Sequence, residues 1–569
     1  MKSVFRLILC CLIAFQPVSA QETTLDAIKR VIDKIMVETD FELTVKTQQA
    51  SETVQSVQFS NFNSQSSSAF FYAFSFVECA EAGIYSLGFA ANNPGEIFVN
   101  TEKIFTSNSN SGFWFSEFAY DRYNFPNKTQ AFFKKGRNTV LIKSTTTKPP
   151  AFYLAVLENN AEISPKLKFT SAPYSQSENS DWLICFTNDS LLHKYNSPVN
   201  AVHSTWFTPE IPLISKLMAG SNASFKKHSY VEWHYSNGAT LWSILNFAGK
   251  TQNTVYEDFV KKCCDFNIRN YEKFKTQYYQ LNEIHGYNHR LYRLQMLDDS
   301  SAPALPYLKL YTENKLTEAD FILKKVEDFV VNKQTRLSDG TYCRSEPWNE
   351  SIWADDLFMS APYLMMLSKS TENPKYYDDA AFQVISYYKH LYDKKTGLCR
   401  HGWVNSPTKD SIPYWSRANG WMIWATTEVL LNLPESHKNY KIIQNIFVTH
   451  VEGLLKWQNN DGFLHQLLND SNSFTETSST AMLTIALARG VNNGWLPKKY
   501  KKQALKSWNA VLSRIETDGN VKGICEGTSI SAKSDYYLNR RTMDHDPRGL
   551  GAVITAGFEM LQLERFHSK

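Results

Sequence analysis

The segment Asp461-Gly462-Phe463-Leu464-His465-Gln466 closes one helical stretch and opens a short aromatic and polar turn before the next helix. The same signal recurs through the C-terminal part of the chain, at intervals of 57, 65 and 57 residues. The glycines that mark it are Gly340, Gly397, Gly462 and Gly519. Self-similarity at such a period is typical of stacked supersecondary units, and the unit here is a helical hairpin. The polar turn residues are therefore expected to gather at one end of the stack, where a site can form.

Helical patterns continue from Trp233 to the end of the chain and amount to roughly six hairpins. The predicted helices cover residues 239–248, 254–272, 302–313, 317–332, 353–368, 375–392, 420–432, 439–457, 476–489, 498–515 and 549–564. Closing six hairpins into a ring gives an (α/α)6 toroid, whose inner helices carry long apolar runs such as Ala481–Ala488. We therefore predict an all-α (α/α)6 catalytic domain at residues 229–569.

Residues 45–200 have a different pattern, in which short strands alternate with Gly, Asn, Pro and Ser. This predicts an antiparallel all-β sandwich, so the chain has two domains. The predicted strands cover residues 53–59, 69–77, 83–90, 96–100, 138–143 and 151–157. An amphipathic helix at 26–37 lies in the preceding lead-in (21–44), and a linker (201–228) with a predicted helix at 211–218 follows.

The N-terminus has the features of a secretory signal: Lys2 and Arg6 supply the charge, Leu7–Phe15 the apolar run, and Val18-Ser19-Ala20 the cleavage site. We expect export, to the periplasm or the medium, with the mature chain starting near Gln21. No other segment is apolar enough to span a bilayer. Sixty Lys and Arg against 56 Asp and Glu give a net charge of +4, without the basic stripe of a nucleic-acid-binding protein.

Seven cysteines remain after the signal segment, an odd and scattered set that indicates no disulfide framework. Most are expected to be small buried hydrophobes. A disulfide between Cys343 and Cys399, in neighbouring turns, is left open. No Cys and His spacing indicates a zinc site, so we expect neither a metal nor a cofactor.

Two segments concentrate residues of catalytic type. In Trp353-Ala-Asp355-Asp356-Leu-Phe-Met359, a carboxyl group near a helix start lies between apolar side chains, where desolvation would raise its pKa and suit a general acid. The alternative is an Asp stabilised by the helix dipole. In Tyr414-Trp-Ser-Arg417-Ala-Asn-Gly-Trp421, Arg417 and Trp421 share one helix face, where Arg offers a planar fork for a carboxylate and Trp a stacking surface for a sugar ring.

Other polar segments have a structural and a functional interpretation. Asp298-Asp299 is either a solvated turn or a pair of site carboxylates, and Glu476 either caps a helix or belongs to the site. His401 lies in the turn Gly397-Leu-Cys-Arg-His-Gly-Trp403, where a lone imidazole is more often structural.

These segments, in this order, resemble the unsaturated rhamnogalacturonyl hydrolases and unsaturated glucuronyl hydrolases of glycoside hydrolase families 105 and 88. The resemblance covers about residues 228–569 and implies an (α/α)6 toroid without a metal. The β-sandwich, through "AGIYSLGFAANNPGEIFVN" and "FKKGRNTVLIKS", loosely resembles jelly-roll modules of carbohydrate-active enzymes. The matching segments of the toroid are "WHYSNG", "WADDLFMSAPYL", "GLCRHGW", "YWSRANGW", "DGFLHQLL", "ETSSTAMLTIALARGVNNGWL" and "HDPRGLGA".

The resemblance also implies a reaction. The substrate is an oligosaccharide left by a polysaccharide lyase, whose non-reducing sugar is a uronate with a C4=C5 double bond. One carboxyl group protonates C4 of this enol ether, water adds at C5, and the hemiketal opens and releases the remaining chain. Whether the uronate is galacturonyl or glucuronyl is left open, as are the parent polysaccharide and the oligomeric state.

Carried over by position, Asp355 matches the family's acid and base, and Asp298 its second essential carboxylate. Four residues match substrate-pocket positions: His401, Trp415, Arg417 and Trp421. Trp233, Arg344 and Gln466 complete the predicted substrate-binding set. The chain departs from the family where relatives often carry His in the Gly340 turn and Asp at position 404, which here is Val404. Two alternative functions remain open: a uronate lyase or dehydratase on the same toroid, and a non-catalytic sugar-binding protein.

Overall fold

The computed structural model describes most of the chain from Ala20 onward. The described ranges are 20–41, 43–45, 55–58, 70–91, 94–107, 127–145, 151–158, 162–164, 166–170, 182–187, 217–219, 230–279, 288–346, 348–405 and 412–565. The predicted signal segment, apart from Ala20, and most of the predicted linker lie outside these ranges.

Six helices form a closed inner ring, because each contacts the next and the last contacts the first. They are α3 (Tyr235–Thr251), α7 (Ser301–Thr312), α9 (Asp356–Thr371), α11 (Ser416–Asn432), α13 (Thr477–Asn492) and α16 (Pro547–Arg565). In α13 every residue from Thr477 to Gly490 is buried, as expected for a helix surrounded by others. The predicted (α/α)6 toroid is therefore confirmed.

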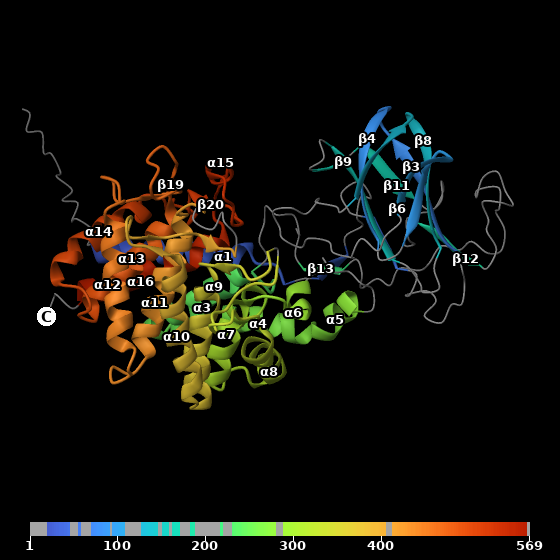
Figure 1. Ribbon diagram of the computed structural model, residues 1–569. Helices are drawn as coiled ribbons and strands as arrows, with labels where there is room; N and C mark the ends of the chain where they lie inside the picture. The colour runs from blue at the N-terminus through green and yellow to red at the C-terminus, as the bar shows by residue number, and fades with distance from the viewer. Residues whose placement is uncertain are drawn as a thin grey trace, which may run out of the picture.

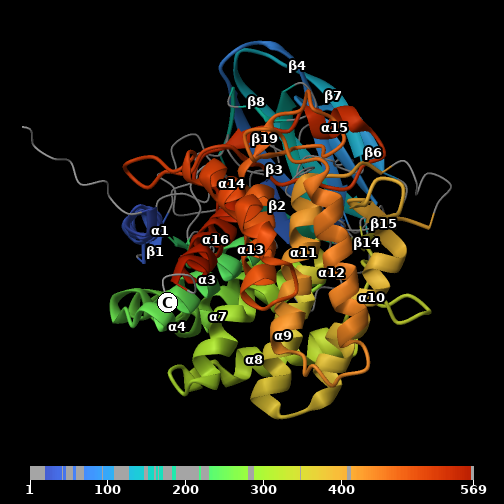
Figure 2. The same cartoon turned by 90° about the vertical axis from the view of Figure 1, so that its left-hand side faces the viewer.

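An outer helix packs on each inner helix. The outer helices are α4 (Thr254–Arg269), α8 (Asp320–Asp328), α10 (Pro374–Leu391), α12 (Tyr440–Leu455), α14 (Lys501–Leu512) and α1 (Ala20–Glu38). Although α1 lies more than five hundred residues from α16 in the chain, it lies beside α16 in space (Figures 1 and 2). Its Thr24 accepts a hydrogen bond of 3.0 Å from the indole of Trp508 in α14, and its Asp33 accepts one of 3.0 Å from Tyr256 in α4. The first helix of the chain therefore completes the outer ring.

The four repeated glycines have φ values of +91°, +77°, +95° and +86°, a conformation that glycine adopts without strain. Three of them also contact the backbone of the next outer helix, where a Cβ would meet Gly453 at 2.8 Å, Lys506 at 2.5 Å and Arg30 at 2.2 Å. These are the contacts of Gly397, Gly462 and Gly519, respectively. The periodic signal in the sequence thus marks the turns in which an outer helix returns toward the next inner helix.

After these turns the chain forms two-residue strands that pair in antiparallel ribbons. The pairs are β14 (Ile352–Trp353) with β17 (Gly402–Trp403), β15 (Tyr392–Asp393) with β16 (Leu398–Cys399), β18 (Leu464–His465) with β19 (Thr475–Glu476), and β20 (Ile524–Cys525) with β21 (Thr542–Met543). Because each ribbon precedes an inner helix, the polar turn residues share one end of the toroid, as predicted.

The N-terminal part is an antiparallel sandwich of two sheets. One sheet has the order β10 (Glu162–Ile163), β9 (Ala151–Glu158), β4 (Gly83–Ala91) and β7 (Asn127–Phe133), with β2 (Gln55–Gln58) also on β9. The other has the order β11 (Leu167–Thr170), β3 (Phe70–Cys79), β8 (Gly136–Thr145), β5 (Gly95–Val99) and β6 (Glu102–Ser107), with β12 (Leu183–Thr187) also on β3.

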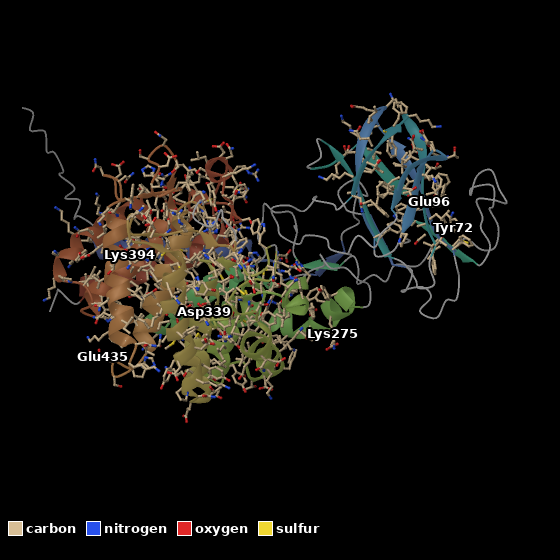
Figure 3. The ribbon with its side chains drawn as sticks, viewed as in Figure 1. Tyr72, Glu96, Lys275, Asp339, Lys394 and Glu435 are labelled. Atoms are coloured by element: carbon tan, nitrogen blue, oxygen red, sulfur yellow. The ribbon has the colours of Figure 1, made fainter. Side chains whose placement is uncertain are left out.

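Side chains such as Phe71, Leu87 and Ile142 fill the space between the two sheets. On the opposite face of the second sheet, Tyr72, Lys143 and Glu96 lie side by side across β3, β8 and β5, and Glu96 pairs with Lys143 at 3.1 Å (Figure 3). The pattern of short strands thus predicted the antiparallel sheets of this region correctly.

Between the two parts of the chain, β1 (Leu43–Val45) pairs with β13 (Leu217–Ala219). The helix predicted at 211–218 is therefore wrong at its C-terminal end, where antiparallel pairing with β1 imposes a strand, and residues 211–216 lie outside the described ranges. The seven cysteines within the described ranges, Cys343 and Cys399 among them, are buried free thiols, so these two do not form a disulfide. Within the described ranges no helix has the length and apolarity needed to cross a membrane.

Candidate active site

Asp355 immediately precedes α9 and lies two residues after the end of strand β14. Its side chain does not cap the helix, although its position would allow that role. The side chain is 15% exposed, and its Oδ2 lies 3.2 Å from Nε2 of His401. The carboxyl group is therefore turned toward the imidazole instead of the helix N-terminus.

The pairing of β14 with β17 brings these two residues together. Trp353 lies opposite Gly402, and the amide of Ala354 donates a hydrogen bond of 2.9 Å to the carbonyl of His401. A Cβ on Gly402 would lie 2.8 Å from the carbonyl oxygen of Ile352, so glycine allows this close approach. Two turns that are nearly fifty residues apart in the sequence are thereby held in register.

His401 is fully buried among aromatic rings. The ring of Trp415 lies 4.5 Å from it, that of Trp353 lies 5.9 Å away, and the hydroxyl of Tyr537 lies 2.8 Å from Nδ1. Burial lowers the pKa of His401, against the opposing effect of Asp355. The imidazole is therefore neutral at neutral pH, with one nitrogen that donates and one that accepts.

Arg344 connects two further carboxyl groups of the site. Its guanidinium makes a two-pronged ion pair with Asp356, at 2.8 Å and 2.6 Å, and lies 3.2 Å from Oδ1 of Asp298. It also lies 4.1 Å from the ring of Trp353. Partial burial raises the pKa of Asp298, and Arg344 opposes this effect. Arg344, predicted to bind substrate, is 4% exposed and binds these two carboxylates instead of facing open space.

Trp415 and Gln466 come from neighbouring turns and are hydrogen-bonded to each other. The indole of Trp415 donates to Oε1 of Gln466 at 3.1 Å, and the amide of Ser416 donates to the Gln466 carbonyl at 3.0 Å. Arg417 lies 4.5 Å from the Trp415 ring, is 1% exposed, and donates to the carbonyls of Cys525 and Glu526. Arg417 thus holds the segment after β20 in place.

The last two predicted residues are buried in the toroid. The indole of Trp233 donates a hydrogen bond of 2.6 Å to the carbonyl of Asp299 and so supports the turn that carries Asp298. Trp421 stacks on Trp424 at 5.7 Å between ring centroids and is 2% exposed. Glu476, whose role was left open, caps α13 by accepting a hydrogen bond of 2.7 Å from the amide of Ser479.

Two residues of the site, Tyr537 and Asp356, were absent from the sequence prediction. Tyr537 belongs to the short helix α15 (Ser534–Leu538), far from the repeated turns, and only the doublet Tyr536-Tyr537 marks it in the sequence. Asp356 directly follows Asp355 in the sequence, but the sequence pattern does not show that Arg344 pairs with it.

Three buried oxygen and nitrogen atoms of the site make no hydrogen bond: Asp355 Oδ2, His401 Nε2 and Asp298 Oδ1. Buried polar atoms without partners are costly and are concentrated where a ligand supplies the partner. Within the described part of the chain, no group of three or more His, Cys, Asp or Glu residues is arranged to hold a metal ion. The site therefore presents acid–base groups and indoles to a polar ligand.

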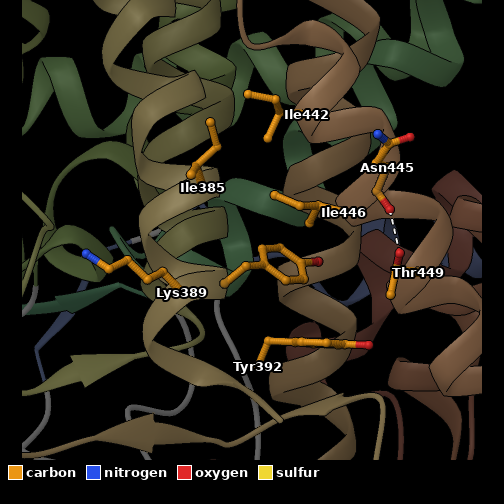
Figure 4. A pocket seen from close by; sticks show the side chains of 8 residues that line it. Ile385, Lys389, Tyr392, Ile442, Asn445, Ile446 and Thr449 are labelled. Carbon is orange, nitrogen blue, oxygen red and sulfur yellow. Dashed lines mark hydrogen bonds between the residues drawn. The ribbon is translucent and has the colours of Figure 1, made fainter. Parts of the chain in front are cut away.

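A separate groove of about 400 Å³ lies between the outer helices α10 and α12 (Figure 4). Its lining is mainly apolar, with Ile385, Ile442 and Ile446 among its residues, and it contains no carboxyl group. None of the predicted site residues lines it.

A carboxyl group, an imidazole and indoles at the turn end of an (α/α)6 toroid define the class of the protein as an enzyme of carbohydrate chemistry. Residues 214–564, more than half of the chain, match Glycosyl Hydrolase Family 88. The chain belongs to this family and is a glycoside hydrolase.

The names of similar curated proteins agree with this family assignment. The chain is 32% identical over 228 residues to the unsaturated 3S-rhamnoglycuronyl hydrolase of Formosa agariphila, a match that covers 37% of this chain and 58% of that protein. It is 28% identical over 261 residues to the unsaturated rhamnogalacturonyl hydrolase YesR of Bacillus subtilis, which covers 44% of this chain and 74% of that protein.

Solved structures support the fold. A possible member of family GH105 from Salmonella enterica serovar Paratyphi A gives a TM-score of 0.52 at 20% identity, covering 58% of this chain and 84% of that chain. A family 105 glycoside hydrolase of C. acetobutylicum gives 0.50 at 25% identity, with 58% and 93% covered.

Proposed function

We propose that this enzyme removes a 4,5-unsaturated uronate from the non-reducing end of lyase-generated oligosaccharides, with Asp355 as the acid and base. One observation carries the proposal. Of the three carboxyl groups gathered at the turn end, Asp298 and Asp356 are bound by Arg344, whereas Asp355 has no arginine partner among the described residues. A single unpaired carboxyl group suits enol-ether hydration, because ordinary glycosidases need two opposed ones.

The reaction follows from the groups present. The Asp355 carboxyl group donates its proton to C4 of the alkene, and the cation that results is shared between C5 and the ring oxygen. Water adds at C5 as its proton passes to the Asp355 carboxylate, which restores the acid. The hemiketal then opens, and the bond to the remaining chain breaks. Asp298 is placed to orient the sugar ring or the water.

We further propose rhamnose as the sugar next to the uronate. The Formosa and Bacillus relatives are both named for substrates that contain it. The loop that Arg344 and Ser351 close by strand pairing carries Trp348, which is 43% exposed and lies 6.4 Å from the ring of Trp353. An exposed indole next to Trp353 offers an apolar surface to the methyl-bearing face of a 6-deoxy sugar.

The test is the absorbance of the double bond during incubation with unsaturated disaccharides of defined neighbouring sugar. With the wild-type enzyme, we expect the absorbance of the double bond to disappear when the substrate is a uronyl–rhamnose disaccharide. With Asp355→Asn, we expect this absorbance to decrease slowly at most. The matched control is Asp320→Asn, which changes an exposed carboxylate of an outer helix. A signal that rises on saturated oligosaccharides would identify a lyase, and full activity of Asp355→Asn would exclude Asp355 as the acid.

A further inference from the structure

Tyr537 is buried next to the predicted acid but does not touch it. Its hydroxyl accepts a hydrogen bond of 3.1 Å from the amide of Ser531 and lies 2.8 Å from Nδ1 of His401. Burial raises the pKa of the Tyr537 phenol, so it keeps its proton at neutral pH. Tyr537 therefore has one O–H to donate.

The acceptor of the Tyr537 hydroxyl hydrogen can be identified from the donors and acceptors around it. Since the Ser531 amide already points at the phenol oxygen, the Tyr537 hydrogen points elsewhere. Within the described residues, the acceptor at hydrogen-bond distance is Nδ1 of His401. A nitrogen that accepts carries no proton, so a neutral imidazole must carry its proton on Nε2.

The groups that face His401 allow it to stay neutral. Asp355 favours the imidazolium, whereas Arg417 and Arg344 disfavour it, and the rings of Trp353 and Trp415 exclude water. Nε2 of His401 lies 3.2 Å from Oδ2 of Asp355, so its N–H is on the side of this carboxyl group, although the two atoms form no hydrogen bond in this structure.

We propose that Tyr537 is a positioning residue, which fixes the Nε2–H tautomer of His401 and thereby keeps the catalytic proton of Asp355 on Oδ1, facing the substrate. The inference rests on the proposed role of Asp355 as the acid. With the opposite tautomer, the Nε2 lone pair would accept the carboxyl proton and hold it away from the alkene.

The assignment also fits the proton balance of the reaction. When the Oδ1–H bond breaks and the C4–H bond forms, the electron pair stays on Asp355, and the Nε2–H of His401 faces the new carboxylate. A hydrogen bond to the charged form stabilises it. When water adds at C5, the carboxylate recovers a proton, and His401 has kept its own throughout.

A second pair in the same toroid shows this tautomer from independent contacts. Asn419 is fixed by the backbone of Cys399, which accepts from its Nδ2 at 2.7 Å and donates to its Oδ1 at 2.8 Å. The same Oδ1 lies 3.1 Å from Nε2 of His450, so that nitrogen must carry the proton. The hydroxyl of Tyr388 lies 2.7 Å from Nδ1 of His450, as Tyr537 does beside His401.

The experiment compares Tyr537→Phe with Tyr536→Phe. Tyr536 is the matched control, because its hydroxyl also accepts a backbone amide of this loop, that of Ser529 at 3.0 Å, whereas the hydroxyl at hydrogen-bond distance from His401 is that of Tyr537. The tautomer is read from ¹⁵N shifts of histidine-labelled protein, with the His401 signals assigned by their absence in His401→Gln. Activity is read as kcat and KM on an unsaturated disaccharide.

We expect Nε2–H at His401 in the wild-type protein and a mixture or Nδ1–H in Tyr537→Phe. We expect kcat of this variant to fall about tenfold, the equivalent of one hydrogen bond, with KM changed less than about twofold. Tyr536→Phe should keep the wild-type tautomer and kcat.

Nδ1–H in the wild-type protein would overturn the proposal, and this result needs no folded variant. Equal losses of kcat in the two phenylalanine variants would also overturn it, because they would reflect the loop instead of the imidazole. The spectrum requires no substrate, so the tautomer is decided even if the wild-type enzyme turns over no unsaturated disaccharide. That last result would refute the proposed function separately.

Discussion

Arg344→Met tests whether the buried cation holds the site together. The change removes the partner of Asp356, which is 1% exposed, and of Asp298, while a side chain of similar length fills the space. Breaking a buried ion pair at one end costs about 3–5 kcal/mol, because the other charge is left without compensation. We expect a loss of this size in the free energy of unfolding at pH 8.

The loss should depend on pH in a defined direction. Burial raises the pKa of Asp356 to about 6, although Arg344 opposes this shift. Since the folded-state pKa lies above the unfolded value of about 3.9, folding disfavours the ionised form. Without Arg344 the pKa of Asp356 rises further, so the protonated carboxyl group limits the loss at pH 5. The loss is therefore smaller at pH 5 than at pH 8.

The assay is urea unfolding followed by tryptophan fluorescence at both pH values. Asp320→Asn is the control, because its ion pair with Lys324 is exposed (42% and 74%) and pairs of this kind contribute about 0–1 kcal/mol. The double variant Arg344→Met/Asp356→Leu should recover part of the lost stability, since only Asp298 then lacks its partner. A loss below about 1 kcal/mol for Arg344→Met at pH 8 would refute the reasoning.

Three further changes test other features. Gly519→Ala should lower the free energy of unfolding by about 3 kcal/mol, because a Cβ would lie 2.2 Å from the Arg30 carbonyl. Gly494 is also at positive φ but has open space around it, so Gly494→Ala should lower the free energy of unfolding by about 1 kcal/mol in the same urea titration. Burial lowers the pKa of His450 to about 3, so the unfolded chain takes up the proton first, and this group alone should remove about 2 kcal/mol of stability between pH 7 and pH 5. His450→Gln should flatten that acid slope, and an unchanged slope would contradict the assignment. Trp348→Ala should raise KM about tenfold for the disaccharide and leave the methyl glycoside of the unsaturated uronate unaffected; equal effects on both would show that the indole does not contact the second sugar.

Much of the fold was predictable because its signals are local. A glycine at positive φ must recur wherever an outer helix returns, so Gly340 and its repeats identified the hairpin unit without any knowledge of contacts. Asp355 could be placed at a helix start for the same reason. The prediction that it faces His401 could not come from spacing, because the pairing of β14 with β17 creates that contact.

The features of the fold and of the site that the sequence did not predict depend on contacts between distant segments of the chain. The amphipathic pattern identified the helix at 26–37, but nothing in it indicates packing on a helix that begins at Pro547. Likewise, the roles of Arg344 and Tyr537 are set by partners in other turns. In each case the residue type was visible, and its partner was not.

The position of α1 has a consequence for the order of the chain. In the sequence every inner helix from α3 to α13 is followed by its outer partner, but the partner of α16 is found at the opposite terminus. The ring is thus built of six hairpins, five of them continuous in sequence and the sixth formed by α16 and α1, with the sandwich in the connection between α1 and α3. A gene that starts at α3 and appends α1 after α16 should therefore encode the same ring of helices. In this arrangement the sandwich is no longer needed to connect two helices of the ring and can be left out.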